Sequence, residues 1–429
     1  MAPMMITFLL LLVIPSGSVV AAADDGDDMS NNLFSDLAPL LTLFGEQFAK
    51  QYLSQSMNWL DNVIFAMAPL GIITAIVGAI RVGGPSWLKA LIGRARENRA
   101  TVEVELMSST SHEVCELWNG QGIIRTMGRP EIKQIIYLKS ADGTDTGETF
   151  GLHTVESAMQ AGHLEARAPD LNNVRLASNI GGPQAAPSIS LNLHGGNKVS
   201  ELYAAAICGL VLQVGVLFYC GALVYLPALL EKLPKDGVGS WPFPVLATGT
   251  IALFIGMFLC SGIVEKSTKE TAFMLKHHDD TPQPETVRIL WLQTSHIVSD
   301  QTFDSFVIFG KHESDRILTS RRDNDLDPQW IASFENVTVF GTSFGLAGFV
   351  LQFQGLRGMN WSASIAQLIA VSLMTVWRAW LRRYLTETPI PRQVPAQHEM
   401  DWLALWMAKK LGDDESGGIH WPADDEVLG

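Results

Sequence analysis

Charged residues are scarce in this chain. Asp, Glu, Lys and Arg make up 17% of its 429 residues, whereas 47% are hydrophobic and the mean hydropathy is +0.18. Soluble globular proteins are usually richer in charge than this. The composition therefore favours a membrane protein over a soluble one.

Basic residues are the rarer of the two signs of charge. The 30 Lys and Arg residues are outnumbered by 44 Asp and Glu residues, which gives a formal net charge of −14. Proteins that bind nucleic acid carry clustered Lys and Arg on a basic face. We therefore do not expect nucleic acid among the partners of this chain.

Cysteine is also scarce, with four residues in the whole chain. Cys208, Cys220 and Cys260 lie in apolar runs and Cys115 lies in polar sequence, so no disulfide framework is visible. The adjacent residues 277–280, two His and two Asp, are a weak metal motif, because the ligands of a structural site are separated in sequence and converge in space. We expect no metal and no other cofactor.

The first 23 residues have the order of a signal peptide. A short apolar core from Ile6 to Ile14 is followed by Ala21 and Ala23, which form a small-residue cleavage signal. We expect cleavage after residues 1–23 and entry into the secretory pathway. The alternative is a retained anchor, because the apolar run is about 20 residues long.

Five further apolar runs are long enough to cross a membrane, since a bilayer core of about 30 Å needs roughly 20 residues of helix. They are residues 62–80, 202–230, 241–264, 336–356 and 358–377. Trp361, Trp377 and Trp380, near the last run, are placed like the aromatic belt of a membrane interface.

Basic residues beside the runs predict the orientation, because Lys and Arg accumulate on the cytosolic side. Arg81 follows the first run, Lys266 the third and Arg378 the fifth. The pattern places the C-terminus in the cytosol. It predicts an extracytosolic amphipathic helix within 24–61, an outer loop at 231–240, cytosolic inserts at 81–201 and 265–335, and a cytosolic tail, 378–429, with a second amphipathic helix.

The two inserts together have the length of one ordinary domain. Alternation of apolar and polar residues predicts a strand at 101–107, and apolar runs at 132–138 and 287–293 are also typical of strands. The expected fold is a helical membrane protein with about five transmembrane helices after a signal peptide and a cytosolic α/β domain formed from both inserts. The alternative is two separate, partly disordered loops.

The segment from Gly341 to Gly345 matches two motifs. As G-x-S-x-G it is the nucleophile elbow of serine hydrolases, and as G-x-x-x-G it has the spacing at which membrane helices pack. Ser343 lies at hydrocarbon depth in the fourth run, and too little chain follows for the acid, the His and the strands that carry them. We predict instead that Gly341, Gly345 and Gly348 form a helix-packing face.

A basic stretch follows the first run. Juxtamembrane Lys and Arg attract anionic lipid, at about 1 kcal/mol each. The residues that could make such contacts are Arg81, Lys89, Arg94, Arg96 and Arg99. The alternative is that they are an ordinary positively charged flank.

Ionisable residues are missing from the interiors of the apolar runs, where they usually mark ion or solute pathways. Gln213, Gln352 and Gln367 are the strongest polar groups there. Glutamines of membrane helices more often hydrogen-bond to a neighbouring helix than line a pore. A transporter or channel subunit is therefore the second choice of function.

Two segments, which begin FGEQFAKQYL at Phe44 and GLRGMNWSAS at Gly355, resemble a large group of multi-pass membrane proteins of filamentous fungi. The resemblance extends to Arg125 and to Arg383, which is most of the membrane-proximal sequence. It implies a fungal source and residence in a membrane. It carries over no catalytic or ligand-binding residue.

The sequence therefore favours an integral membrane protein of the secretory pathway or plasma membrane, with the lipid bilayer as its surroundings. Because no catalytic constellation is visible, we expect a non-enzymatic signalling or scaffold protein whose cytosolic domain binds a cytosolic protein partner. A transporter or channel subunit is the alternative, and a serine hydrolase that uses Ser343 is the third choice.

Overall fold

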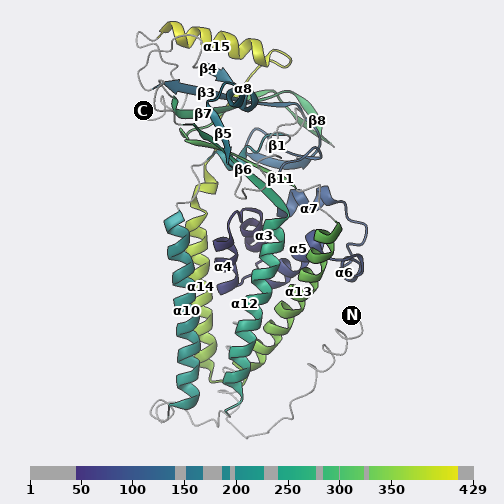
Figure 1. The fold of residues 1–429 in the computed structure, drawn as a ribbon, viewed down its shortest axis with the longest axis vertical. Coiled ribbons are helices and arrows are strands. Elements are labelled where there is room, and N and C mark those ends of the chain that lie inside the picture. Colours follow the sequence, from purple (N-terminus) through teal and green to yellow (C-terminus); the bar gives the residue numbers. More distant parts are fainter. Residues whose placement is uncertain are drawn as a thin grey trace. The chain divides into compact units, whose positions relative to one another are not determined.

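The computed structural model describes residues 45–140, 151–167, 186–193, 199–226, 240–276, 284–298, 300–322 and 328–413. The expected signal peptide and nearly all of the expected outer loop lie outside these residues. The chain divides into two compact units, which we call the helical unit and the β-sheet unit (Figure 1). The helical unit comprises Met1–Ala95, Val199–Glu265 and Asp327–Trp380, and the β-sheet unit comprises Arg96–Lys198, Lys266–Leu326 and Leu381–Gly429.

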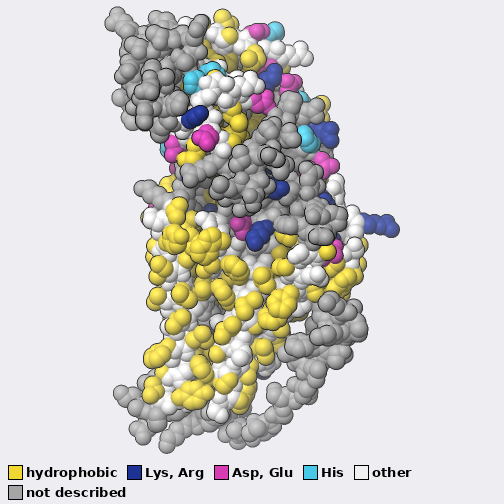
Figure 2. Space-filling view, viewed as in Figure 1, with side chains coloured by type: hydrophobic (Ala, Val, Ile, Leu, Met, Phe, Trp, Pro, Cys, Tyr) yellow, Lys and Arg dark blue, Asp and Glu magenta, His cyan; other side chains and the backbone are white. Residues whose placement is uncertain are grey.

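Four long helices dominate the helical unit: α10 (Val199–Tyr225), α12 (Pro242–Lys266), α13 (Pro328–Arg357) and α14 (Trp361–Leu381). They coincide with the second to fifth predicted runs and are long and apolar enough to cross a membrane. Hydrophobic side chains cover their surface (Figure 2), and Ile207, Val211 and Phe218 of α10 are exposed. An apolar surface of this extent suits lipid better than water.

The first predicted run, 62–80, is not a single helix, so the prediction is wrong in this respect. Helix α4 (Trp59–Met67) ends before Ala68, and helix α5 (Ile72–Gly83) begins after Gly71. Pro69 has no N–H to donate, and Gly71 has φ +75°, a left-handed conformation that favours glycine. The chain therefore turns between the two helices, although the hydropathy of the run is continuous.

Helix α3 (Glu46–Ser54) covers part of the expected amphipathic segment 24–61. Its apolar residues Ala49, Tyr52 and Leu53 are buried. The start of α3 lies against the turn after α4, since a Cβ added to Gly71 would be 2.8 Å from the Ala49 Cβ. Helix α3 is thus packed within the helical unit. A short helix, α6 (Ser86–Leu91), follows α5.

A five-stranded sheet forms the centre of the β-sheet unit. Its strand order is β12-β10-β7-β3-β4, and strands from both inserts and from the tail contribute to it. The strands are β3 (Ile132–Ser140), β4 (Gly151–His153), β7 (Pro284–Gln293), β10 (Phe306–Phe309) and β12 (Ile390–Gln393). The longest pairing joins β3 of the first insert to β7 of the second, with Ile136 opposite Ile289.

Smaller sheets and helices surround this centre. They are the three-stranded sheet β11 (Arg316–Arg322), β6 (Thr268–Leu275) and β5 (Leu164–Arg167), the hairpins β1 (Val114–Trp118) with β2 (Ile123–Met127) and β8 (His296–Val298) with β9 (Gln301–Phe303), the helices α7 (Arg99–Leu106), α8 (Val155–Gln160) and α15 (Glu399–Asp413), and the 3-10 helices η2 (Ser190–Asn192) and η3 (Arg383–Thr386). Every strand pairing among the described residues is antiparallel. The unit is therefore of α+β type, not the alternating α/β type expected from the sequence.

Residues 101–106 form part of helix α7, so the strand predicted at 101–107 is wrong. The side chain of Asn98 caps this helix by accepting a hydrogen bond from the Ala100 N–H at 3.2 Å. Val102, Glu103 and Leu106 are all buried, and their spacing lies on one face of a helix. Packing of this face outweighs the alternating pattern.

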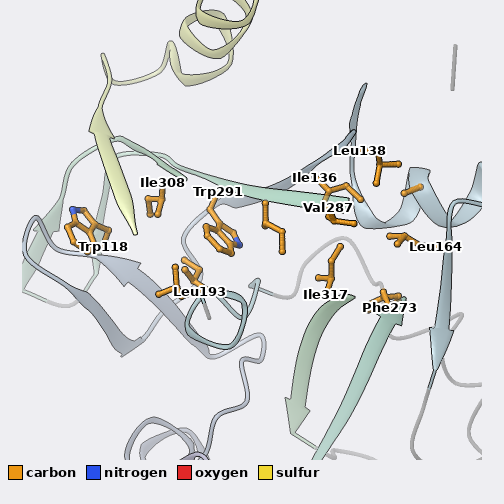
Figure 3. Packing of buried hydrophobic residues seen from close by; sticks show 13 residues of the cluster. Trp118, Ile136, Leu138, Leu164, Leu193, Phe273, Val287, Trp291, Ile308 and Ile317 are labelled. Carbon is orange, nitrogen blue, oxygen red and sulfur yellow. The ribbon is translucent and has the colours of Figure 1, made fainter. Parts of the chain in front are cut away.

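The central sheet is buried on both faces. One face holds Ile136, Ile289 and Trp291 with residues of the smaller sheets (Figure 3). The other holds residues such as Leu290 and Phe309, which pack against Leu403, Trp402 and Trp406 of α15. The expected second amphipathic helix is thus α15, and it covers the sheet.

Candidate functional site

The three predicted packing glycines lie on α13 where it meets α12. A Cβ added to Gly341 would be 2.9 Å from the Leu259 Cβ, and one added to Gly345 would be 2.6 Å from the Met257 Cε. A Cβ on Gly348 would overlap the backbone of Leu253. The backbones of the two helices therefore approach closely along this face.

The five basic residues named from the sequence have different surroundings. Arg81 is buried on α5, so it does not present its charge to a lipid surface. Lys89 is half-buried on α6, whereas Arg94, Arg96 and Arg99 are exposed. The prediction of contact with anionic lipid therefore remains for Arg94, Arg96 and Arg99, whose charges are exposed.

Ser343 and the three glutamines of the apolar runs lie within the long helices. Ser343 lies in the middle of the uninterrupted helix α13, whereas a nucleophile elbow is a strand-to-helix turn. The Gln213 amide donates to the carbonyl of Met67, and the Gln352 amide donates to the Thr250 hydroxyl at 3.2 Å. Both amides are therefore bonded to neighbouring segments, and Gln367 is buried.

Arg378 is a residue whose place the sequence did not reveal. It was expected to flank the fifth run on the cytosolic side, yet its side chain is buried in the helical unit. Its guanidinium donates to the carbonyls of Ile64, Phe65 and Ala68, at the end of α4. A hydropathy window shows only that Arg378 stands next to an apolar run.

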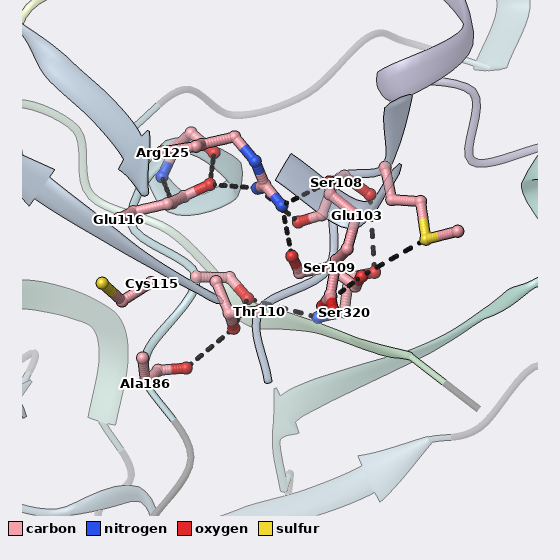
Figure 4. Close-up of polar contacts among 12 residues, drawn as sticks. Glu103, Ser108, Ser109, Thr110, Cys115, Glu116, Arg125, Ala186 and Ser320 are labelled. Atoms are coloured by element: carbon pink, nitrogen blue, oxygen red, sulfur yellow. Dashed lines mark hydrogen bonds and ion pairs between the residues drawn. The ribbon is translucent and has the colours of Figure 1, made fainter. Parts of the chain in front are cut away.

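Two buried glutamates anchor a polar cluster in the β-sheet unit (Figure 4). Glu116 on β1 is fully buried and pairs with Arg125 on β2, with an oxygen-to-nitrogen distance of 2.7 Å. It also accepts hydrogen bonds from the N–H and the hydroxyl of Ser190 at 2.8 and 2.7 Å. Each of its oxygens is therefore satisfied, as a buried carboxylate requires.

Glu103 on α7 is the second buried carboxylate. It pairs with Arg322 at 2.9 Å and accepts hydrogen bonds from the hydroxyls of Ser109 and Ser111 at 2.9 and 3.1 Å. Burial raises the pKa of Glu103 above its ordinary value, against the opposing effects of Arg322, the two serines and Arg125. The free energy lost by removing this carboxylate from water is thus only partly offset by its partners.

Arg321 completes the cluster and holds Thr110 in place. It donates to the Thr110 hydroxyl and to the Ala186 carbonyl, the latter at 2.8 Å. Burial lowers the pKa of Arg321 to about 10, although Glu103 and Glu116 act in the opposite direction. The guanidinium therefore stays charged at neutral pH, and the cluster ties α7, β1 and β11 together.

Cys115 lies beside this cluster but is not an activated thiol. It is fully buried, and its sulfur is 3.6 Å from the carbonyl oxygen of Thr126. Burial and the neighbouring Glu116 raise the pKa of Cys115 to about 12. The thiolate, which is the nucleophilic form, is therefore negligibly populated at neutral pH. We interpret the whole cluster as structural.

A groove of about 490 Å³ is the candidate binding site of the β-sheet unit. It lies where the start of β3, the end of β7 and the first turn of α15 meet. Its lining is polar and mainly acidic, with carboxylates, hydroxyls and one Lys. The lining residues are Glu131, Lys133, Leu292, Thr294, Ser295, Ala396, Gln397, Glu399, Met400 and Asp401.

Backbone strain marks one wall of the groove. Gln397 has φ +68° and is the one non-glycine residue of the described chain with a positive φ. Its N–H donates to the Glu399 carboxylate at 3.0 Å, and the Ser305 hydroxyl donates to the same oxygen at 2.6 Å. Strained conformations of this kind are held by their surroundings and cluster at functional sites.

The charges of the groove differ in accessibility. Glu131 and Asp401 are exposed, and Lys133 lies 3.3 Å from Glu131. Burial tends to raise the pKa of Glu399, but its hydrogen bonds from Ser305 and the backbone and the nearby His398 outweigh this, so the pKa is lowered. Glu399 is therefore ionised at neutral pH, and the groove has three carboxylates against one ammonium.

Among the described residues, no group of three or more His, Cys, Asp or Glu is arranged to hold a metal ion. Residues 277–280, the weak metal motif of the sequence, lie outside the described part of the chain. Comparison of the chain with known protein families, curated proteins and solved structures finds no match.

Proposed function

We propose that this chain is an integral membrane protein of non-enzymatic function, whose β-sheet unit acts as a scaffold or signalling module by binding a basic segment of a partner protein. The observation that carries the proposal is the acidic groove at the start of α15. Three carboxylates and one Lys give its lining a net charge of −2 at neutral pH. A segment with Lys or Arg would neutralise this charge, and an acidic segment would be repelled.

The groove also has the features of a formed recognition site. The exposed side chain of Met400 offers apolar surface, and the hydroxyl of the exposed Ser295 offers a hydrogen bond. The strained backbone at Gln397 is fixed by Glu399, so the wall is preorganised before a ligand arrives. A preorganised groove loses less conformational entropy on binding than a loop that must first be ordered.

The surroundings of the candidate nucleophiles and of the buried carboxylates support a non-enzymatic role over a hydrolase. Ser343 stands inside a helix, and the thiol of Cys115 is buried and protonated. The carboxylates of Glu103 and Glu116 are engaged by arginines and hydroxyls within the fold. Ser343 therefore lacks the strand-to-helix turn of a nucleophile elbow, and Cys115 lacks the lowered pKa of an activated thiol.

We further propose that the β-sheet unit and the C-terminus are cytosolic, in a membrane of the secretory pathway or in the plasma membrane. The support is the charge beside the long helices. Lys266 ends α12, and Arg382 and Arg383 follow the end of α14. Basic residues at these ends favour the cytosolic side.

The binding test uses purified full-length protein in detergent. Fluorescence anisotropy is measured for a labelled nonapeptide rich in Lys and Arg, and for an acidic peptide of equal length. We expect the basic peptide to bind more tightly, with an affinity that falls as salt rises. The double variant Glu131→Gln/Asp401→Asn removes the two exposed carboxylates and should weaken binding about tenfold, a loss of roughly 1.4 kcal/mol.

The matched control removes two exposed carboxylates elsewhere in the same unit, through Glu156→Gln and Glu165→Gln on α8 and β5. It should leave the affinity for the basic peptide unchanged. Equal losses in the two double variants would show that only net charge matters, and the groove would then not be the site.

A transporter or channel subunit is the second candidate, and the broken helix of residues 59–83 favours it. Discontinuous membrane helices often form solute sites with their unwound backbone. In this chain the freed carbonyls accept hydrogen bonds from Arg378 and Gln213. Transport would require a solute to displace these side chains, so solute flux into proteoliposomes that is lost in Gln213→Leu would favour this candidate.

A further inference from the structure

The two ends of the broken helix meet the same end of α12. At the start of α4, the Asn62 amide contacts Ser261 and Glu265, with distances of 2.5 Å to the Ser261 hydroxyl and 2.6 Å to the Glu265 carboxylate. At the end of α5, a Cβ added to Gly83 would be 2.9 Å from the side chain of Ile263. Residues 261–265 are the last turns of α12, which ends at Lys266.

The turn between α4 and α5 lies deep along the bundle. Tyr225 at the end of α10 stacks edge-on against Phe243 at the start of α12, so α10 begins at the end where α12 finishes. The residue before the turn, Met67, contacts Gly209 and accepts a hydrogen bond from Gln213. Gly209 and Gln213 follow Val199, the first residue of α10, by 10 and 14 positions. The turn therefore lies roughly 15–21 Å from the start of α10 along its axis.

We propose that residues 59–83 form a re-entrant hairpin, which enters and leaves the membrane on the side where both inserts join the helices. Helix α4 carries the chain about halfway into the bundle and α5 returns it. The expected crossing at 62–80 is thereby replaced by a segment that does not cross. This inference rests on the membrane residence proposed above, and it assigns both flanks of the segment to one side.

Non-helical backbone at membrane depth persists only where protein satisfies its polar groups. The last carbonyls of a helix have no partners within that helix. Here Arg378 donates to the carbonyls of Ile64, Phe65 and Ala68, and Gln213 donates to that of Met67. Two side chains of the long helices thus satisfy the end of α4.

The guanidinium of Arg378 is itself held by aromatic rings. Its central carbon lies 5.6 Å from the ring centroid of Tyr52 and 5.6 Å from that of Phe65. A cation over aromatic faces is stabilised where water is excluded. The buried charge therefore has partners on α3 and α4, which fixes the hairpin to α14.

Labelling of single cysteines tests the inference. The full-length protein is prepared with its four native cysteines replaced by alanine, and one cysteine is introduced by Trp59→Cys, Leu91→Cys, Gln121→Cys or Leu226→Cys. Trp59 and Leu91 flank the segment, Gln121 lies in the first insert and Leu226 follows α10, and all four are exposed. Sealed vesicles are treated with a membrane-impermeant maleimide before and after permeabilisation.

We expect residues 59, 91 and 121 to behave alike, so that all three react in sealed vesicles or all three react only after permeabilisation. Residue 226 should show the other behaviour. Reaction of residues 59 and 91 from opposite sides would overturn the hairpin and restore the crossing. Equal reaction of all four in sealed vesicles would show that the long helices do not cross. That outcome contradicts the proposed membrane residence, so the two failures are distinguishable.

Discussion

At the scale of single residues, Arg378 is the side chain on which the arrangement of α4 depends most. In Arg378→Met the carbonyls of Ile64, Phe65 and Ala68 lose their donor while remaining buried. Each buried polar group left unpaired costs about 1–3 kcal/mol. We predict a strong fall in melting temperature and in the monodisperse yield in detergent.

The control for this prediction is Arg357→Met, which makes the same chemical change at an exposed position at the end of α13. We expect a small effect there. If both variants melt like the wild-type protein, the hydrogen bonds of Arg378 do not hold the hairpin.

Glu103 predicts a pH dependence of the β-sheet unit. Its pKa is raised in the folded state, mainly by burial, above its ordinary value of 4.5. Between that value and the raised pKa the folded state binds more protons than the unfolded state, so stability falls as pH rises through this window. Compared with Glu103→Gln, the wild-type protein should lose stability as the pH is raised from 4.5.

The measurement is the difference in melting temperature between wild-type protein and Glu103→Gln at a series of pH values. Other titrating groups are shared by both proteins and largely cancel. A difference that grows in favour of the wild-type protein with rising pH would contradict the assigned direction.

At the scale of elements, the contact between α12 and α13 predicts a ranking of glycine substitutions. A Cβ at Gly348 meets the backbone of Leu253, which cannot move without moving α12, whereas a Cβ at Gly345 meets the flexible end of Met257. We predict that Gly348→Ala lowers the melting temperature more than Gly345→Ala does. Ser343→Ala on the same helix removes only a hydroxyl and should have the smallest effect, since interhelical hydrogen bonds average about 0.6 kcal/mol.

The melting temperatures of the three variants in one detergent decide the order. Equal values for Gly348→Ala and Ser343→Ala would remove the argument for close backbone packing at this interface.

The start of α15 predicts a second pH dependence, of opposite sign. The pKa of Glu399 is lowered, because its hydrogen bonds and His398 outweigh the effect of burial. The ionised Glu399 carboxylate therefore stabilises the folded state above the ordinary carboxyl pKa of 4.5. This stabilisation is lost as the pH falls through the lowered pKa. Ser305→Ala removes one of these hydrogen bonds and should cost roughly 1–3 kcal/mol at neutral pH.

Denaturant unfolding followed by tryptophan fluorescence reports this cost, and the exposed Ser295→Ala is its control. The difference between wild-type protein and Ser305→Ala should shrink at acid pH. A cost that is independent of pH would place the effect of Ser305 elsewhere.

Predictability from the sequence differed among elements for physical reasons. The four long helices follow from hydropathy alone, because lipid-facing helices are apolar on most sides. The break at Pro69 and Gly71 was not predicted, because the hydropathy of the run 62–80 is continuous across it. Residues 101–106 alternate like a strand, and only tertiary packing of Val102 and Leu106 makes them helical.

The candidate groove could not be predicted, because its parts are brought together by long-range pairing. Glu131 belongs to the first insert, Thr294 to the second and Asp401 to the tail. Their proximity depends on the register of β3 with β7 and on the packing of α15 over the sheet. Charge along the sequence gives no signal for such a site.

At the scale of the whole molecule, the chain combines four helices long and apolar enough to cross a membrane with a folded α+β unit that carries an acidic groove. The proposed membrane residence and the proposed binding function are linked by chain connectivity, since both inserts and the tail continue from the ends of long helices. A partner bound in the groove would therefore be held at the membrane.

Photo-crosslinking in native membranes tests whether the groove holds a partner at the membrane. A photoreactive residue replaces Met400, which lines the groove, or Leu405, which is exposed on the same helix outside the lining. We predict discrete crosslinked products in the membrane fraction for position 400, diminished by an added basic peptide and missing at position 405. Identical products at both positions, or products at position 400 that the basic peptide does not diminish, would show that the groove does not bind a basic partner.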